Sequence, residues 1–69
     1  MKKTGQRIKE LREELEFTQA KLGEKVGKAS NTIVQYENGT SKMSIDVLTR
    51  MAQVLKTSSD YLLGLTDMP

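Results

Sequence analysis

The sequence predicts an all-α domain of five short helices, and three observations support this prediction. Apolar residues recur at spacings of three and four along most of the chain, which is the spacing of amphipathic helices. Glycines follow three of these apolar segments, where helices often end. The 69 residues include no cysteine, so no disulfide can stabilise the chain and a compact helical bundle is favoured. We therefore expect residues 1–69 to form a single domain.

The first helix is predicted from about Thr4 to Leu15, because Ile8, Leu11 and Leu15 form one apolar stripe. Residues 1–3 are expected to form a loose arm before this helix. At the other end of the chain, residues 66–69 are expected to be a frayed end or the start of a linker.

The second helix is predicted from Gln19 to Val26. Thr18 is a suitable N-cap, and Gly27 can end the helix in the left-handed conformation that glycine adopts at little cost. Phe17, the only phenylalanine of the chain, is expected to dock into the core.

The third helix is predicted from Ser30 to Asn38 and is separated from the second by only a few residues. Two helices joined in this way must cross at a steep angle, as in a helix-turn-helix. Gly23 faces the third helix and allows the two to approach closely. Ala29, Ile33 and Tyr36 are expected to bracket its buried side.

The last two helices are predicted at residues 45–55 and 59–63. Ser44 and Ser58 precede them as N-caps, and Gly64 closes the fifth. The residues expected on the buried face of the fourth helix are Ile45, Leu48, Met51, Ala52 and Leu55.

Composition excludes several classes of function. The chain has no histidine, which is the commonest general base and metal ligand, and nothing resembles a nucleophile with its base, a metal cluster or a phosphate loop. We therefore expect no enzyme activity, no metal, no cofactor and no small-molecule substrate. No long apolar run is present, so we expect no membrane span and a soluble, cytoplasmic protein.

Charge is distributed unevenly. The net charge of +2 decides little by itself, but the basic excess lies in the amino-terminal part. Residues 19–42 carry Lys21, Lys25, Lys28 and Lys42 against Glu24 and Glu37. This imbalance is expected if that side of the molecule meets phosphate.

The outward face of the predicted third helix is rich in amides. Opposite Ile33 lie Lys28, Asn31, Gln35 and Asn38, with no carboxylate among them. Side-chain amides can pair with adenine edges in the major groove of DNA, where a carboxylate would repel phosphate. A helix that needs only solubility would more often carry Glu and Lys, although a simple solvated face is the alternative.

A resemblance agrees with this interpretation and covers residues 8–65. The matching residues are Phe17-Thr18-Gln19, Leu22, Gly23, Val26-Gly27, Thr32-Ile33, Tyr36-Glu37, Gly39, Leu48, Ala52, Leu55 and the tail from Asp60 to Leu65. Together they resemble the helix-turn-helix of the Cro and repressor proteins of temperate phages and of related bacterial regulators. The resemblance implies a five-helix, lambda-repressor-like fold. It also implies a transcriptional regulator that binds double-stranded DNA at a near-palindromic operator as a homodimer.

The resemblance also implies roles for individual residues. Base edges would be contacted by Lys28, Ser30, Asn31 and Gln35. Val34 lies on the flank of the outward face by the helical period, and it is expected either to contact a thymine methyl group or to pack at the edge of the core. DNA phosphates would be bound by Gln19, Asn38, Thr40, Ser41 and Lys42. The alternative to a loose amino-terminal arm is that Lys2 and Lys3 also touch the DNA backbone.

Glu37 requires a separate explanation, because the helical period places it near the core side of the third helix. A buried carboxylate needs a partner, and the resemblance supplies Arg12. We predict an Arg12–Glu37 ion pair; the alternative is an exposed glutamate at the rim.

The sequence departs from the family pattern at four positions. Lys28 stands where an apolar residue is usual, Ala29 where a hydroxyl N-cap is usual, Met43 where proline is common and Glu16 where glycine is frequent. Either Ser30 caps the third helix instead of Ala29, or the cap is lost. A different class of function is also open, namely an antitoxin or antirepressor-like module that binds protein, with Tyr61 and Leu65 as candidate contacts.

Overall fold

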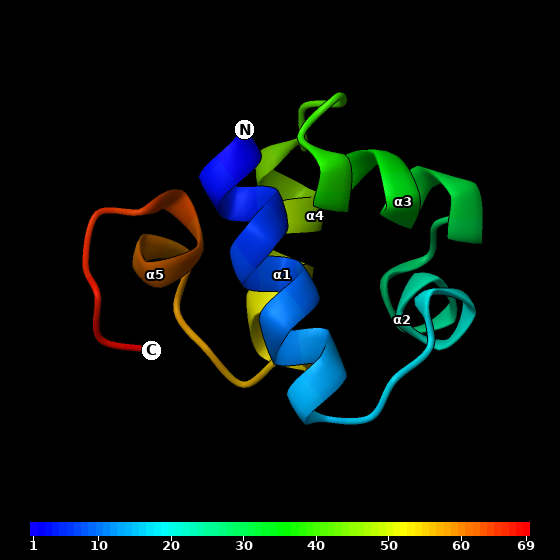
Figure 1. The fold of residues 1–69 in the computed structure, drawn as a ribbon, viewed down its shortest axis with the longest axis horizontal. Helices are drawn as coiled ribbons and strands as arrows, with labels where there is room; N and C mark the ends of the chain where they lie inside the picture. The colour runs from blue at the N-terminus through cyan, green and yellow to red at the C-terminus, as the bar shows by residue number, and fades with distance from the viewer.

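The computed structural model describes all 69 residues and contains five helices and no strand. The helices are α1 (Lys2–Glu14), α2 (Gln19–Val26), α3 (Ser30–Asn38), α4 (Ile45–Val54) and α5 (Ser59–Leu63). In Figure 1, α2 and α3 lie on one side of α1, and α5 and the carboxyl terminus lie on the other. The predicted all-α fold is confirmed. None of the helices has the length and apolar composition needed to span a bilayer.

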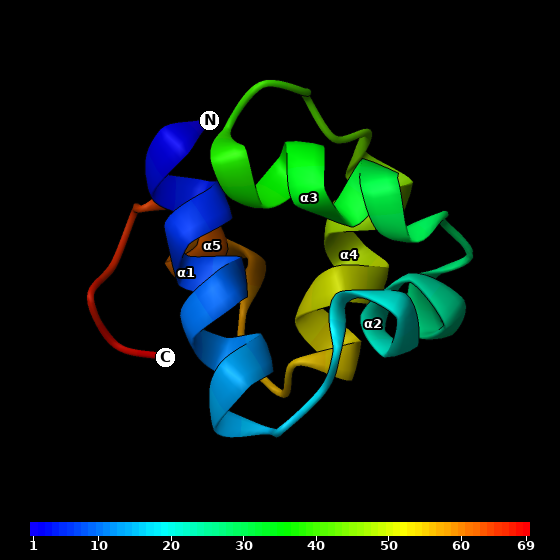
Figure 2. The ribbon, with the colours of Figure 1, turned by 45° about the vertical axis from the view of Figure 1, so that its right-hand side comes forward.

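One apolar core joins the five helices. Figure 2 shows α1, α3, α4 and α2 arranged around the interior that this core fills. Its buried residues are Ile8, Leu22, Val26, Ile33, Tyr36, Leu48, Met51, Ala52, Leu55 and Leu62. Every helix contributes at least one of these residues. The hydrophobic effect, which favours burial of these side chains away from water, therefore holds all five helices together.

The predicted loose arm is wrong, because α1 begins at Lys2 and its first turns are packed. Thr4 and Gly5 are buried, and Gly5 lies against the end of α3. A Cβ added to Gly5 would fall against the carbonyl oxygen of Tyr36 and only 2.6 Å from that of Glu37. Glycine at this position therefore lets the two helix backbones touch, and this contact fixes the start of α1.

The junction of α2 and α3 has the expected close approach. A Cβ on Gly23 would collide with the backbone carbonyl of Lys28, and the side chain of Ile33 lies 3.4 Å from the same point. Gly27 ends α2 with φ of 75°, and the Lys28 N–H donates to the Gly23 carbonyl at 2.8 Å. The steep crossing of the two helices thus depends on two glycines, one for space and one for backbone conformation.

Three residues expected in the core lie elsewhere. Phe17 is only half-buried and is not part of the core; the ammonium of Lys25 lies 5.2 Å from the centre of its ring. Ile45 is 79% exposed because the first turn of α4 precedes the part of the helix that is covered, which begins at Leu48. Ala29 is exposed because it is the N-cap of α3, outside the helix proper.

Most helix ends are capped as the sequence indicates. The hydroxyls of Thr18, Ser44 and Ser58 accept hydrogen bonds from the third backbone N–H that follows each of them. At α3 the N-cap is Ala29, which makes no side-chain bond, so the cap is lost and Ser30 does not replace it. Glu16 has φ of 60°, so the chain adopts the left-handed conformation there without the glycine frequent in the family.

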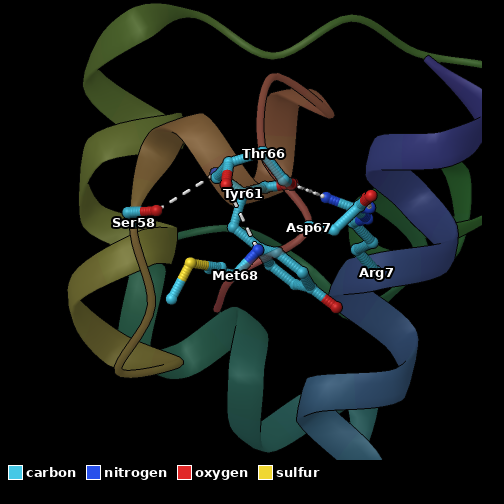
Figure 3. A network of polar contacts seen from close by, with 6 residues as sticks. All are labelled: Arg7, Ser58, Tyr61, Thr66, Asp67 and Met68. Carbon is cyan, nitrogen blue, oxygen red and sulfur yellow. Dashed lines mark hydrogen bonds and ion pairs between the residues drawn. The ribbon is translucent and has the colours of Figure 1, made fainter.

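Arg7 holds the carboxyl-terminal segment against α1, as Figure 3 shows. Its guanidinium donates to the backbone carbonyls of Tyr61 and Thr66 at 2.5 and 2.7 Å and to the Asp67 carboxylate at 2.7 Å. It also lies 4.1 Å from the centre of the Tyr61 ring. The chain through residue 67 is therefore attached to α1, and the expectation of a frayed end from Thr66 is wrong for these residues.

Candidate nucleic-acid interface

The exposed surface of α3 carries polar side chains without negative charge. Asn31, Gln35 and Asn38 are exposed, and Ile33 on the opposite side is fully buried. The only carboxylate of α3, Glu37, is buried. An anion that approaches this face therefore meets amide donors and no exposed acid from α3 itself.

Other predicted base-reading residues lie beside this face. Ser30 begins α3 and Lys28 precedes it, and both are exposed. Val34 is half-buried, between the exposed amides and the core. Its partial exposure is compatible with either role expected for it.

Glu37 forms the ion pair expected with Arg12. Nε of Arg12 donates to the Glu37 carboxylate at 2.6 Å, and a second guanidinium nitrogen does so at 3.2 Å. The third nitrogen donates to the backbone carbonyl of Phe17 at 2.7 Å. The Glu37 side chain is only 2% exposed, so this fork-shaped pair joins α3 to α1 and to the loop before α2 inside the protein.

Gln19 belongs to the same network, which the sequence did not reveal. Its amide nitrogen donates at 3.0 Å to Oε1 of Glu37, the carboxylate oxygen that also accepts the longer bond from Arg12. One amide N–H is therefore used inside the protein, and the second remains free to donate. Glu37, near the end of α3, thus orients the side chain of Gln19, the first residue of α2.

The loop after α3 folds back on Gln35. The backbone N–H and the hydroxyl of Thr40 both donate to the Gln35 backbone carbonyl, at 3.0 and 3.2 Å. The Ser41 hydroxyl donates to the Gln35 side-chain oxygen at 3.0 Å. Among the predicted phosphate-binding residues, Thr40 and Ser41 therefore already donate to Gln35, whereas Asn38 and Lys42 are exposed and make no side-chain hydrogen bond within the chain.

Comparison with known proteins identifies the family. A family model described as helix-turn-helix matches residues 8–62. The chain belongs to this helix-turn-helix family. Its match extends from the first core residue of α1 to the last core residue of α5, so the whole apolar core lies inside the family's domain.

Individual relatives are regulators. The chain is 39% identical over 64 residues to an uncharacterized helix-turn-helix-type transcriptional regulator, YobD of Bacillus subtilis (strain 168). The aligned residues cover 93% of this chain and 57% of YobD. The chain spans about half the length of the curated relatives it matches.

Solved structures of helix-turn-helix proteins have the same arrangement of helices. The P22 c2 repressor, crystallised with a synthetic operator, matches with a TM-score of 0.85 and 32% identity over 90% of this chain and 94% of that chain. The SinR protein, solved in complex with the SinI protein, matches with a TM-score of 0.79 and 35% identity over 86% of this chain and 58% of that chain. The lambda-repressor-like fold expected from the resemblance is therefore confirmed.

A shallow hollow next to the helix-turn-helix was not anticipated. It lies between the turn at Gly27 and the first turns of α4 and is lined in part by Lys28, Arg50 and Asp46. The Arg50 guanidinium comes within 3.4 Å of the position that a Cβ on Gly27 would occupy. Two basic side chains and one acidic side chain line this hollow, so the basic character noted in residues 19–42 extends onto α4. A sequence pattern places Arg50 on a helix but cannot place it against a turn 23 residues earlier in the sequence.

Proposed function

We propose that residues 1–69 act as a DNA-binding domain of a transcriptional regulator, and that the domain inserts α3 into the major groove of double-stranded DNA. The observation that carries this proposal is the exposed amide face of α3, from which the only acidic residue of the helix has been withdrawn into the core. The operator complex of the similar P22 c2 repressor supports it.

The proposed roles follow the geometry of the site. Base edges are read by Lys28, Ser30, Asn31 and Gln35, with Val34 at the margin. Phosphates are bound by Gln19, Asn38 and Lys42, whereas the N–H and hydroxyl of Thr40 and the hydroxyl of Ser41 already donate to Gln35. The Arg12–Glu37 pair sets the position of α3 relative to α1 and does not contact DNA.

We further propose that two copies bind a near-palindromic operator with half-sites about 10 bp apart, the spacing of one helical turn. The domain acts in the cytoplasm and as a repressor, and we assign it no catalytic reaction. Sedimentation of the protein with a selected duplex, compared with the protein alone, gives the stoichiometry; a single copy bound to each duplex would contradict the dimer.

Selection of bound duplexes from a random pool tests sequence-specific binding directly. Gln35→Ala is expected to relax selection at one base-pair position by about 1–3 kcal/mol, because one amide contact is lost. Lys42→Ala is expected to weaken binding to all duplexes alike. It should also reduce the magnitude of the slope of log binding constant against log salt concentration by about 0.9, the value for one phosphate contact.

Lys9→Ala is the matched control, since Lys9 is an exposed lysine in the middle of α1 and outside the proposed interface. It should leave both the selected sequence and the salt slope unchanged. A selection from which no sequence emerges would reject the proposed function.

A second candidate is binding to a protein partner, and one observation favours it. Leu63, Leu65 and Met68, at the carboxyl-terminal end, are exposed apolar side chains, and the similar SinR protein was solved with a protein partner. Replacing Leu65 by Ser should abolish such binding while leaving DNA selection intact. A duplex affinity that does not fall with salt would favour this candidate over DNA binding.

A further inference from the structure

We infer that Ser41 is a positioning residue for Gln35: its hydroxyl holds the amide that reads a base, and it is not a phosphate ligand. This inference rests on the proposed function and deepens it, because it names a residue that sets specificity without touching DNA.

The loop after α3 makes hydrogen bonds to both the backbone and the side chain of Gln35. Gly39, with φ of 76°, turns the chain back over the last turn of the helix. Thr40 then bonds the backbone carbonyl of Gln35, and Ser41 bonds its side-chain oxygen at 3.0 Å. Ser41 itself is half-buried, so its hydroxyl is held in place while the Gln35 amide remains exposed.

The bond leaves Gln35 able to read a base. A glutamine amide has an oxygen with two acceptor sites and a nitrogen with two donors. Ser41 occupies one acceptor site, so one acceptor and both donors remain, which is enough for a bidentate pair with adenine. A free amide can turn to present either its donors or its acceptor. An amide whose oxygen is held by a hydroxyl keeps one order of donor and acceptor, and it therefore discriminates better between base pairs.

The hydroxyl cannot serve both roles at once. A serine hydroxyl has a single O–H donor, and a phosphate oxygen only accepts hydrogen bonds. If the Ser41 O–H points to Gln35, it cannot also donate to phosphate. The two roles therefore predict different results in the same experiment.

The first measurement needs no DNA and follows the mobility of the Gln35 side-chain amide by ¹⁵N relaxation. Gln6 and Gln53 are matched controls, because both are exposed glutamines in helices and make no side-chain hydrogen bond. Gln35 should be more rigid than these two, and Ser41→Ala should make it equally mobile. Ser41→Thr keeps the hydroxyl and should preserve the rigidity. A Gln35 amide as mobile as that of Gln6 in the unaltered protein would overturn the inference.

The second measurement is a double-mutant cycle on duplexes taken from the selection. Ser41→Ala should lower affinity for the preferred duplex by about two- to tenfold, the range for one net hydrogen bond. It should have little effect on a duplex altered at the base pair that Gln35 reads, and none in the Gln35→Ala background. An equal loss on every duplex that persists in the Gln35→Ala background would identify a phosphate contact and overturn the inference.

These results are distinguishable from failure of the proposed function. Absence of any selected sequence rejects DNA reading itself, whereas a selected sequence with an additive Ser41→Ala effect rejects only the positioning role. A thermal melt of Ser41→Ala that coincides with that of the unaltered protein shows that the fold is kept.

Discussion

Glu37 is the acceptor that the buried side-chain hydrogen bonds of the molecule share. Its carboxylate accepts hydrogen bonds from two nitrogens of Arg12 and from the amide of Gln19. The pairing with Arg12 could be predicted, because the helical period placed a charge near the core and the resemblance supplied its partner. The bond from Gln19 could not, since no sequence pattern shows which way an amide at the start of a helix turns.

Removal of one member of this pair should be far more damaging than removal of both. Glu37→Gln leaves the Arg12 guanidinium buried without a counter-charge and is expected to lower the free energy of unfolding by about 3–5 kcal/mol. Total stabilities are about 5–15 kcal/mol, so this loss is large. Urea unfolding measures it.

The double variant Arg12→Met with Glu37→Met is the control, because it replaces the pair by apolar groups and leaves no uncompensated charge. We expect it to be closer in stability to the unaltered protein than either single variant. Equal stability of Glu37→Gln and the unaltered protein would show that the buried pair has no such role.

The helices show which parts of a chain its sequence determines locally. The limits of α2 and α3 could be predicted because Thr18, Gly27 and Gly39 act on their own neighbours. The start of α1 could not, because its N-cap, Met1, makes no side-chain bond and the first turns are held by contact with α3. For the same reason Ile45 was misplaced: its spacing fits the buried stripe, but whether a helix end is covered depends on distant elements.

Gly5→Ala tests the crossing of α1 and α3. Alanine is intrinsically better than glycine in a helix by about 1 kcal/mol. The added Cβ would nevertheless meet the carbonyl oxygens of Tyr36 and Glu37, which are backbone atoms and cannot move cheaply. We expect a net loss of about 1–3 kcal/mol by urea unfolding. Gln6→Ala, at the exposed neighbouring position, should show no such loss, and a stabilised Gly5→Ala would contradict the close crossing.

Ala29→Ser should restore the missing cap of α3. Ala29 already has the extended backbone of an N-cap, with φ of −68° and ψ of 155°, so the hydroxyl needs no rearrangement to reach the third N–H that follows. We expect a gain of about 1 kcal/mol in the free energy of unfolding, read from a thermal melt. Thr18→Ala at the capped start of α2 should produce the opposite change. The Thr32 N–H donates to the Ala29 carbonyl at 3.0 Å, and no gain from Ala29→Ser would mean that an added hydroxyl does not improve on this bond.

At the scale of the whole molecule, the two ends of the chain are fastened to each other by Arg7. The sequence could predict the five helices and which face of α3 is polar, because both follow from periodic patterns and glycines. It could not predict that a residue of α1 bonds α5 and the chain after it, since these contacts join positions 54 to 60 residues apart. The link between Ser41 and Gln35 was missed for a related reason, because it depends on how a loop folds back.

Arg7→Ala should release the carboxyl-terminal segment. The guanidinium side chain is 11% exposed and bonds two backbone carbonyls, so its loss is expected to cost about 1–3 kcal/mol. Asp67 is 89% exposed, and an exposed ion pair contributes at most about 1 kcal/mol, so Asp67→Asn should change stability little. Urea unfolding of both variants, with hydrogen exchange at Leu65 and Thr66, checks this. Equal losses for the two would contradict the larger share assigned to the carbonyl bonds.

The packed start of α1 has a practical consequence for handling the protein. The backbone of Lys2 lies against Gly39, where a Cβ would come within 2.8 Å of the Lys2 Cα, so residues added before Met1 would emerge beside the loop at 40–42. Figure 1 shows the carboxyl terminus on the far side of α1 from α2 and α3. An affinity tag or fluorophore fused after Pro69 would therefore keep clear of that loop, whereas a fusion at the amino end would crowd it and weaken any ligand measured there.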